Sequence, residues 1–580
     1  MSAVVSATMR LVKKELEHYN IQAALQIDET LPSFEIRSVN AALQIAAPDE
    51  TELLYGVYEC AERFYGWDFF EPGKDVFHPE LIQPIPENGI LVPAKPKKIK
   101  RAGFIQEFPF NDDSRATMDW MAKNKINYLM VWMEYYDRMD DELKSFAAER
   151  GIIIESGHHN FNYLIPPEKY RAEHPEFFAE TADNKRRQLA GMPEVTRQLC
   201  TTNPGLRAEL VKNLINYNKI HPEVKFLGLN PNDGFGWCEC ENCSKLYDKS
   251  SMGDSYCRSE KYYRANGIFN KLIADVSTQL HEAAPELVLN FFAYVNYATP
   301  APGFKLTPGT SVHLALYWRC INHEINDPSC GINSGYLRDI LAWEKAKAGG
   351  FLNIYEYYMG INFYLAMPML HFEAMFNELD FYSKHQVDGV FTQFWNEHWS
   401  AYGINYFLMA RAARGETFEE AIGRFYRTRF GKMADKAREF YAKLRKILQK
   451  LGSCHIPHCI SFLSRTTLED LEALRDDAAI IGKECSDLPG RAFPVWVEYM
   501  IRFKKLYDQS LTRRTTEAEV KAFLEWILAQ SDSKLFVPSR FEIFFKSWTD
   551  DIAAGKDWRY FTENNWFTEY DRHAFISPEQ

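Results

Sequence analysis

Several acidic residues stand directly after short apolar runs of the sequence. Asp233 lies in the segment NPNDG, Glu356 in YEYY and Glu397 in WNEHW. Hydrolysis of a glycosidic bond needs one carboxylic acid to protonate the leaving oxygen. A second group acts as base or nucleophile, unless the acetamido group of the substrate attacks instead. We expect Asp233 to be the general acid and Glu356 or Glu397 to be its partner, ahead of Glu134.

Each of these carboxylates also has a structural alternative. An Asp before Gly most often forms a turn or a cap, which applies to Asp233. A charged Glu356 inside an aromatic segment is costly unless it faces an open site or a salt-bridge partner. The position of each residue relative to the strands therefore decides between catalysis and structure.

Aromatic and hydrogen-bonding side chains accompany the acids. Phe, Tyr and Trp make up 15% of the chain. Rings that stack on the CH faces of a sugar, together with fixed donors and acceptors, form a carbohydrate site. The two histidines of the Gly-His-His segment could instead be core or capping residues. The predicted substrate-binding residues are Trp132, His158, His159, Asn232, Tyr294, Trp318, Arg319, Tyr357 and Trp395.

Three cysteines follow the Asp233 segment in the sequence WCECENC. Cys238, Cys240 and Cys243 are close enough to reach one metal ion, and a structural zinc site would need a fourth ligand. Cys257 is the nearest other thiol, and a histidine could serve instead. Plain reduced thiols or a redox pair are the alternatives. The absence of an H-E-x-x-H motif argues against a catalytic zinc, so no cofactor is expected for catalysis.

The elements that must position these residues are eight apolar runs that alternate with helical or loop segments. Such runs are typical of strands buried on both faces of a parallel sheet, and eight of them indicate a (β/α)8 barrel. An open doubly wound sheet is the alternative, weakened by the absence of G-x-G-x-x-G. The runs are 102–106, 126–132, 151–156, 224–230, 287–294, 311–318, 351–357 and 387–395.

The active site of such a barrel lies at the C-terminal ends of its strands, and the acids and rings named above follow these runs. Gln106 and Glu107 follow the first run. Residues 1–98 are predicted to form a small N-terminal α/β domain because strand-like alternation precedes one long amphipathic helix. Residues 99–415 form the barrel and residues 416–580 a C-terminal helical domain. The predicted class is therefore α/β, a TIM barrel with two flanking domains.

Composition limits the partners and the compartment. The formal net charge of −12 argues against nucleic-acid binding, and no run of eighteen apolar residues predicts a membrane span. No secretory leader is evident, and eleven cysteines, an odd number, fit reduced thiols. We therefore expect a cytoplasmic protein. The sequence leaves open whether the chain forms a homo-oligomer.

The motifs carry a family resemblance. The first motif resembles the end of the small domain before the barrel in bacterial α-glucuronidases (glycoside hydrolase family 67) and β-N-acetylhexosaminidases (family 20). Its sequence is LLYGVYECAERFYGWDFFEPGKD. Three further segments resemble a largely uncharacterised bacterial family allied to both. They are GHHNFNYLIPPEKYRAEHPEFFAE, QLCTTNP and LGLNPNDGFGWCECENC. The resemblance spans roughly residues 40–415 and implies a glycosidase-like (β/α)8 barrel.

The resemblance also implies roles for single residues. Family 20 enzymes end the fourth strand with an Asp-Glu pair, where this chain has Asn232-Asp233. Asp233 still stands at the position of the acid, but the missing Asp-Glu pair argues against the substrate-assisted mechanism of family 20. The GIIIESGHH segment is similar to the third-strand motif of that family and implies that His158 binds sugar. The α-glucuronidases take their base from a later strand, as Glu356 or Glu397 would provide, and Arg319 is the strand-end cation for a uronate.

These observations lead to one main hypothesis and two alternatives. The main hypothesis is a glycoside hydrolase, exo-acting on imported oligosaccharides. The first alternative is a non-catalytic carbohydrate-binding protein on the same barrel, suggested by the missing Asp-Glu pair. The second is a metal-dependent hydrolase that uses His158 or His159.

Overall fold

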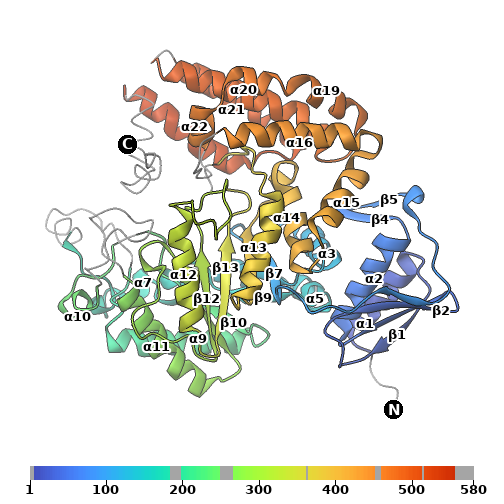
Figure 1. Ribbon diagram of the computed structural model, residues 1–580. Helices are drawn as coiled ribbons and strands as arrows, with labels where there is room; N and C mark the ends of the chain where they lie inside the picture. The colour runs from blue at the N-terminus through green and yellow to red at the C-terminus, as the bar shows by residue number, and fades with distance from the viewer. Residues whose placement is uncertain are drawn as a thin grey trace.

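The computed structural model describes residues 5–182, 198–234, 236–247, 265–360, 364–450, 459–512 and 515–555. A closed barrel occupies the centre of the chain, with an N-terminal unit at one side and a helical unit above it (Figure 1). The element order follows the predicted division into three parts, whose boundaries at residues 98 and 415 stay predictions. None of the described helices is long and apolar enough to cross a membrane.

The predicted (β/α)8 barrel is confirmed. Each of the eight apolar runs overlaps one strand, every strand pairs in parallel with its neighbours, and β14 closes the ring against β7. Most strand residues are buried, as expected for a sheet covered on both faces. The strands are β7 (Arg101–Gln106), β8 (Tyr128–Val131), β9 (Ile153–Ser156), β10 (Phe226–Gly228), β11 (Val288–Ala293), β12 (Thr310–Ala315), β13 (Phe351–Glu356) and β14 (Gly389–Gln393).

Helices follow the strands and form the outer layer of the barrel. The long ones carry an apolar stripe toward the sheet, and α14 is buried along its whole length because β4 (Trp67–Glu71) of the N-terminal unit and α15 (Phe418–Phe430) of the C-terminal unit also pack on it. The main helices are α3 (Ser114–Lys123), α5 (Asp141–Glu149), α9 (Pro204–Ile220), α11 (Asn266–Ala283), α12 (Asn333–Ala346), α13 (Phe372–Lys384) and α14 (Trp399–Ala413). Short helices α4 (Met133–Tyr136), α6 (Phe161–Leu164), α7 (Pro167–Tyr170) and α10 (Glu241–Ser244) lie in the loops.

The N-terminal unit is a four-stranded sheet with two helices and a hairpin. The sheet has the order β1-β3-β2-β6, with β1 and β3 parallel and the other pairs antiparallel. Buried ion pairs of Arg411 with Glu62 and of Arg414 with Glu52 fix this unit to α14. Its elements are α1 (Ala7–His18), β1 (Ala23–Ile27), β2 (Glu35–Val39), β3 (Ala42–Ala47), α2 (Glu50–Phe64), β4 (Trp67–Glu71), β5 (Lys74–Phe77) and β6 (Gly89–Val92).

The C-terminal unit is helical throughout its described residues, as predicted. It docks on the loop after β13, where the Trp496 indole donates to the Ala366 carbonyl at 2.7 Å and the Tyr499 hydroxyl to the Leu365 carbonyl at 2.5 Å. Its helices are α15 (Phe418–Phe430), α16 (Ala434–Gln449), α17 (Cys459–Arg465), α18 (Leu468–Glu472), α19 (Arg475–Glu484), α20 (Phe493–Ser510), α21 (Glu517–Leu528) and α22 (Pro538–Ala553). This docking brings α22 close to the barrel mouth.

Candidate active site

The turn after β9 places two histidines at the barrel mouth. Gly157 has a φ of +129°, and a Cβ there would lie 2.7 Å from the backbone nitrogen of Gly228. Only glycine allows this close crossing over the end of β10. The chain then presents His158, whose ring stacks on Trp132 at 4.9 Å, and His159, whose ring lies edge-on to His158 at 4.7 Å.

Glu107, directly after β7, is an acid that side chains from several strand ends contact at the barrel mouth. Its Oε1 atom accepts hydrogen bonds from Gln393 Nε2 at 2.6 Å and from the Tyr355 hydroxyl at 3.4 Å. His158 Nε2 lies 3.2 Å from the same oxygen. The side chain keeps 14% of its surface exposed, so it is buried but still reaches solvent. Three donors from different strand ends therefore hold one carboxyl group that a ligand can reach.

The surroundings of Glu107 favour its protonated form. Burial is the largest cause that raises the pKa of this carboxyl, and the negative charge of Asp233 raises it further. The Arg540 guanidinium and the hydrogen bonds from Tyr355 and Gln393 lower the pKa but do not outweigh burial. Burial also holds the pKa of His158 well below its usual value, so this ring is neutral at neutral pH. We assign its Nε2–H tautomer, which donates toward Glu107.

Asp233 lies on the open side of the mouth. Its side chain is 69% exposed, and its Oδ1 lies 3.9 Å from His159 Nε2. The turn that carries Asp233 is anchored on both sides, because Gln198 Nε2 donates to the Asn232 carbonyl at 2.5 Å and lies 3.4 Å from the Gly234 carbonyl. Thus Asp233 has a fixed backbone and a carboxylate that faces solvent.

Glu356 and Arg319 form a buried ion pair instead of facing the mouth. Arg319 Nη1 donates to Glu356 Oε1 at 2.6 Å and to Glu378 Oε2 at 3.0 Å, and the exposed fractions of these side chains are 0 to 1%. The Tyr382 hydroxyl also donates to Glu356 at 2.9 Å. This geometry corrects two expectations, since it leaves neither Glu356 as an accessible base nor Arg319 as a cation for a uronate. Of the two possibilities considered for Glu356, an open site or a salt bridge, the structure shows the salt bridge.

Glu397 and Glu134 occupy half-buried positions at the rim. Burial raises the pKa of both carboxyls, and one oxygen of each is buried without a hydrogen-bond partner in the described part of the chain. Among the contacts of the described residues, neither carboxylate reaches Glu107 or Asp233. The catalytic role of Glu397 stays a prediction, and its geometry favours it less than Glu107.

A chain of aromatic rings lines the side of the mouth between β11 and β13. The Tyr317 ring lies 5.8 Å from Tyr294, 4.5 Å from Trp318 and 5.2 Å from Tyr357. Tyr357 stacks on Tyr355, the residue that donates to Glu107, at 4.9 Å. The structure therefore brings Tyr294, Trp318 and Tyr357 together, as their positions at strand ends predict, and joins them to the acid.

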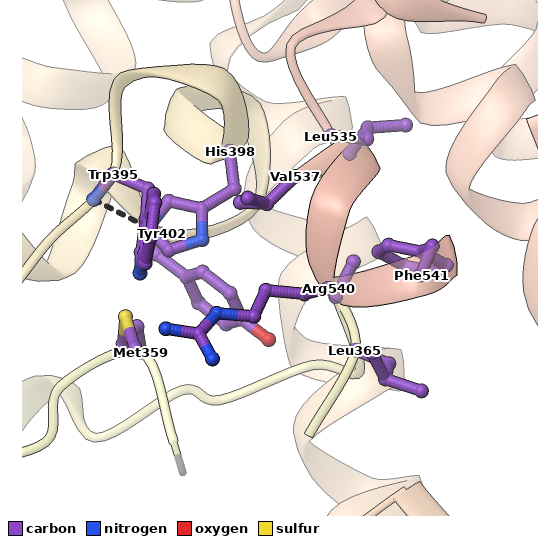
Figure 2. Close-up of a pocket in the computed structure, with 10 residues that line it drawn as sticks. Met359, Leu365, Trp395, His398, Tyr402, Leu535, Val537, Arg540 and Phe541 are labelled. Carbon is purple, nitrogen blue, oxygen red and sulfur yellow. Dashed lines mark hydrogen bonds between the residues drawn. The ribbon is translucent and has the colours of Figure 1, made fainter. Parts of the chain in front are cut away.

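The barrel and the C-terminal unit share a pocket near the mouth (Figure 2). The Arg540 side chain extends into it from α22. The Arg540 guanidinium lies over the Trp395 ring at 4.9 Å and 3.8 Å from Glu107 Oε2. The other residues that line the pocket are Met359, Leu365, Ala366, His398, Tyr402, Leu535, Val537 and Phe541.

Sequence reasoning missed two members of this site. Glu107 stands at a strand end with Phe108 and Phe110 after it, but it was noted only as a residue that follows the first run and was not proposed as an acid. Arg540 lies in an ordinary amphipathic helix far along the chain, and only the docking of α22 brings it to the mouth. The strand-end position was therefore a usable signal for Glu107, whereas no local signal existed for Arg540.

The cysteine cluster gains a fourth member that was not predicted. The sulfur atoms of Cys200, Cys238, Cys240 and Cys243 all lie within 4.8 Å of one another. Cys257, the fourth ligand considered from the sequence, lies outside the described residues. A second group of three that could hold a metal consists of Cys320, His323 and Cys330.

The fold is similar to that of family 89 glycoside hydrolases. The family 89 enzyme from Clostridium perfringens in complex with PUGNAc has a TM-score of 0.57 and 10% identity, over 99% of this chain and 77% of that one. A variant from the same organism, bound to its substrate GlcNAc-alpha-1,4-galactose, has a TM-score of 0.58 and 11% identity, over 90% and 64%. The class that these comparisons define is therefore one of fold, a (β/α)8 barrel with flanking units like that of the family 89 enzymes.

The chain belongs to the family described as Domain of unknown function (DUF4838), whose profile matches residues 85–442, more than half of the chain. A beta-N-acetylhexosaminidase from Bacteroides fragilis NCTC 9343 has a TM-score of 0.45 and 13% identity, over 76% of this chain and 90% of that one. No curated protein matches the sequence. The resemblance to family 67 is not supported by these structures and stays a prediction.

Proposed function

We propose that the protein is a glycoside hydrolase that binds the end of an oligosaccharide at the barrel mouth. The observation that carries this proposal is the convergence of Gln393, Tyr355 and His158 on Glu107, an accessible carboxyl group in an aromatic-lined mouth. Rings and fixed donors suit a sugar, and a carboxyl pair suits cleavage of its glycosidic bond.

Two carboxyl groups in different surroundings divide the acid and base roles. Burial and the nearby charge of Asp233 both raise the pKa of Glu107, so we assign the proton-donating role to Glu107. In our proposal, Glu107 donates this proton to the leaving oxygen, and exposed Asp233 acts as base or nucleophile on the anomeric side. This reverses the assignment suggested by the sequence, in which Asp233 is the acid.

Other residues of the mouth position the sugar in this proposal. Trp132 and Tyr357 offer ring faces, and His158, held neutral by burial, offers hydrogen bonds without a charge. Because Arg319 is neutralised by two carboxylates, it is not available to bind a uronate. The substrate of the family 89 neighbour, GlcNAc-alpha-1,4-galactose, makes N-acetylglucosaminides the first compounds to test.

The test is a screen of aryl glycosides and oligosaccharides, followed by Glu107→Gln and Asp233→Asn on the best substrate. We expect kcat to fall about 10²- to 10⁴-fold in each variant, because each loses one proton-transfer or nucleophilic group. Sugar binding measured by calorimetry should persist. Glu142→Gln, a change to an exposed carboxylate on α5, is the matched control and should leave kcat unchanged.

Two results would contradict the proposal. Full activity in Glu107→Gln would remove this residue from catalysis. Binding of sugars by the unmodified protein, with no turnover of any compound in the screen, would favour the non-catalytic carbohydrate-binding alternative.

A further inference from the structure

Four cysteine thiols from two distant segments converge beside the turn of Asp233. Cys200 comes from the segment before α9, and Cys238, Cys240 and Cys243 come from the segment after that turn. Three of the four are buried, and Cys240 is half-buried. We propose that these thiols, as thiolates, bind one zinc ion in a closed structural site, with Cys200 as the fourth ligand.

The sulfur separations fit tetrahedral coordination. Four sulfurs at ~2.3 Å from one zinc ion lie about 3.8 Å from one another in a regular tetrahedron. Cys200 Sγ lies 3.8 Å from Cys240 Sγ and 4.0 Å from Cys243 Sγ, and all four atoms fall within 4.8 Å. A single metal ion therefore fits the space between them with little movement.

A disulfide does not explain the cluster. A bonded pair of sulfurs lies about 2.05 Å apart, whereas each of these four cysteines is free. Four soft sulfur ligands in a tetrahedral arrangement select zinc or iron over calcium or magnesium. Four protein ligands also leave no open position, which is typical of a structural site and not a catalytic one.

Neighbouring donors are placed to stabilise thiolate charge. The backbone N–H of Glu180 donates to Cys238 Sγ at 3.4 Å, and the Thr202 hydroxyl lies 3.1 Å from Cys243 Sγ. Hydrogen bonds of this kind orient metal-bound ligands and tune their charge. The cluster thus has an outer layer of donors as well as four inner ligands.

The proposed ion would position the turn of Asp233. Gln198, two residues before Cys200, donates to the Asn232 carbonyl on one side of Asp233 and reaches the Gly234 carbonyl on the other. Cys238 lies five residues after Asp233, so the ion would tie the segment of Gln198 to the far end of the same loop. Its role is to hold a loop at the mouth, independently of the reaction that takes place there.

The test measures zinc in the full chain without an affinity tag, purified with reductant and no added metal. We expect about one equivalent of zinc by mass spectrometry of the metals, and a loss of at least five-fold in Cys200→Ser. Cys485→Ser, a change to a buried cysteine outside the cluster, is the matched control and should retain zinc.

X-ray absorption of the unmodified protein keeps the test decisive if Cys200→Ser does not fold. We expect four sulfur neighbours at ~2.3 Å from zinc and no nitrogen or oxygen neighbour. Zinc retained in Cys200→Ser, a mixed ligand shell, bound iron in place of zinc, or no uptake of Zn²⁺ or Co²⁺ by the reduced chain would each overturn the proposal.

Discussion

Glu107 and Glu356 stand at matching places, one just after strand β7 and the other at the end of β13, yet their surroundings differ in kind. Glu356 is sealed from solvent and paired with a guanidinium. Glu107 is partly accessible, receives neutral donors, and has the Arg540 guanidinium 3.8 Å from its second oxygen. A buried carboxylate that is paired with a guanidinium has a structural role. A carboxyl group that still reaches solvent and whose pKa is raised by burial is available for chemistry.

The largest expected effect comes from breaking the buried pair. Arg319→Met leaves Glu356 and Glu378 as buried acids without their cation, so we expect unfolding free energy to fall by about 3–5 kcal/mol. Glu107→Gln, which keeps shape and hydrogen bonding, should change it by less than about 1 kcal/mol. Denaturant unfolding of both variants measures the difference. A stable Arg319→Met with only a raised KM would instead restore Arg319 as a substrate-binding residue.

A smaller effect is expected from loosening the turn on the opposite side of the mouth. Gln198→Met keeps the volume of this buried side chain but removes its hydrogen bonds to the turn of Asp233. We expect kcat to fall about 5- to 10-fold with KM nearly unchanged, because a misplaced carboxylate affects the transition state more than ground-state binding. Steady-state kinetics decide. A change confined to KM would mean that the turn binds substrate rather than positioning Asp233.

The smallest expected effect is a shift in the pH profile. An acid must be protonated, so activity should fall as pH rises through the pKa of Glu107, which burial raises. The Arg540 charge lowers that pKa. Arg540→Met should therefore move the descending limb of kcat/KM to slightly higher pH. Arg502→Met, which removes a surface guanidinium on α20, is the control and should leave the limb in place. A shift to lower pH would contradict Glu107 as the acid.

The fold could be predicted largely from the sequence. Buried parallel strands leave continuous apolar runs, and each of the eight runs overlaps one barrel strand. The placement of His158 and the ring cluster around Tyr317 also followed from strand ends, because all strands of a barrel end at the same mouth. Local sequence pattern was sufficient to predict the strands and the residues at their ends, because each strand of the barrel follows the same rule.

What failed was the pairing of charges and thiols across the structure. The sequence shows Glu356 and Arg319 as two strand-end charges, but only the tertiary structure pairs them directly and brings Glu378 of α13 to the same guanidinium. Cys200 joins the later cysteines because the segment before α9 returns to the loop after β10. Arg540 reaches Glu107 only through the docking of α22. These contacts depend on tertiary geometry, which no local spacing encodes.

The most direct test of the account is the dependence of kcat/KM on the leaving group in Glu107→Gln and Asp233→Asn. Loss of a general acid slows substrates with poor leaving groups far more than activated aryl glycosides, whereas loss of the base or nucleophile slows both alike. We predict a steep dependence for Glu107→Gln and a shallow one for Asp233→Asn. The opposite pattern would make Asp233 the acid and contradict the contrast between Glu107 and Glu356 on which the account rests.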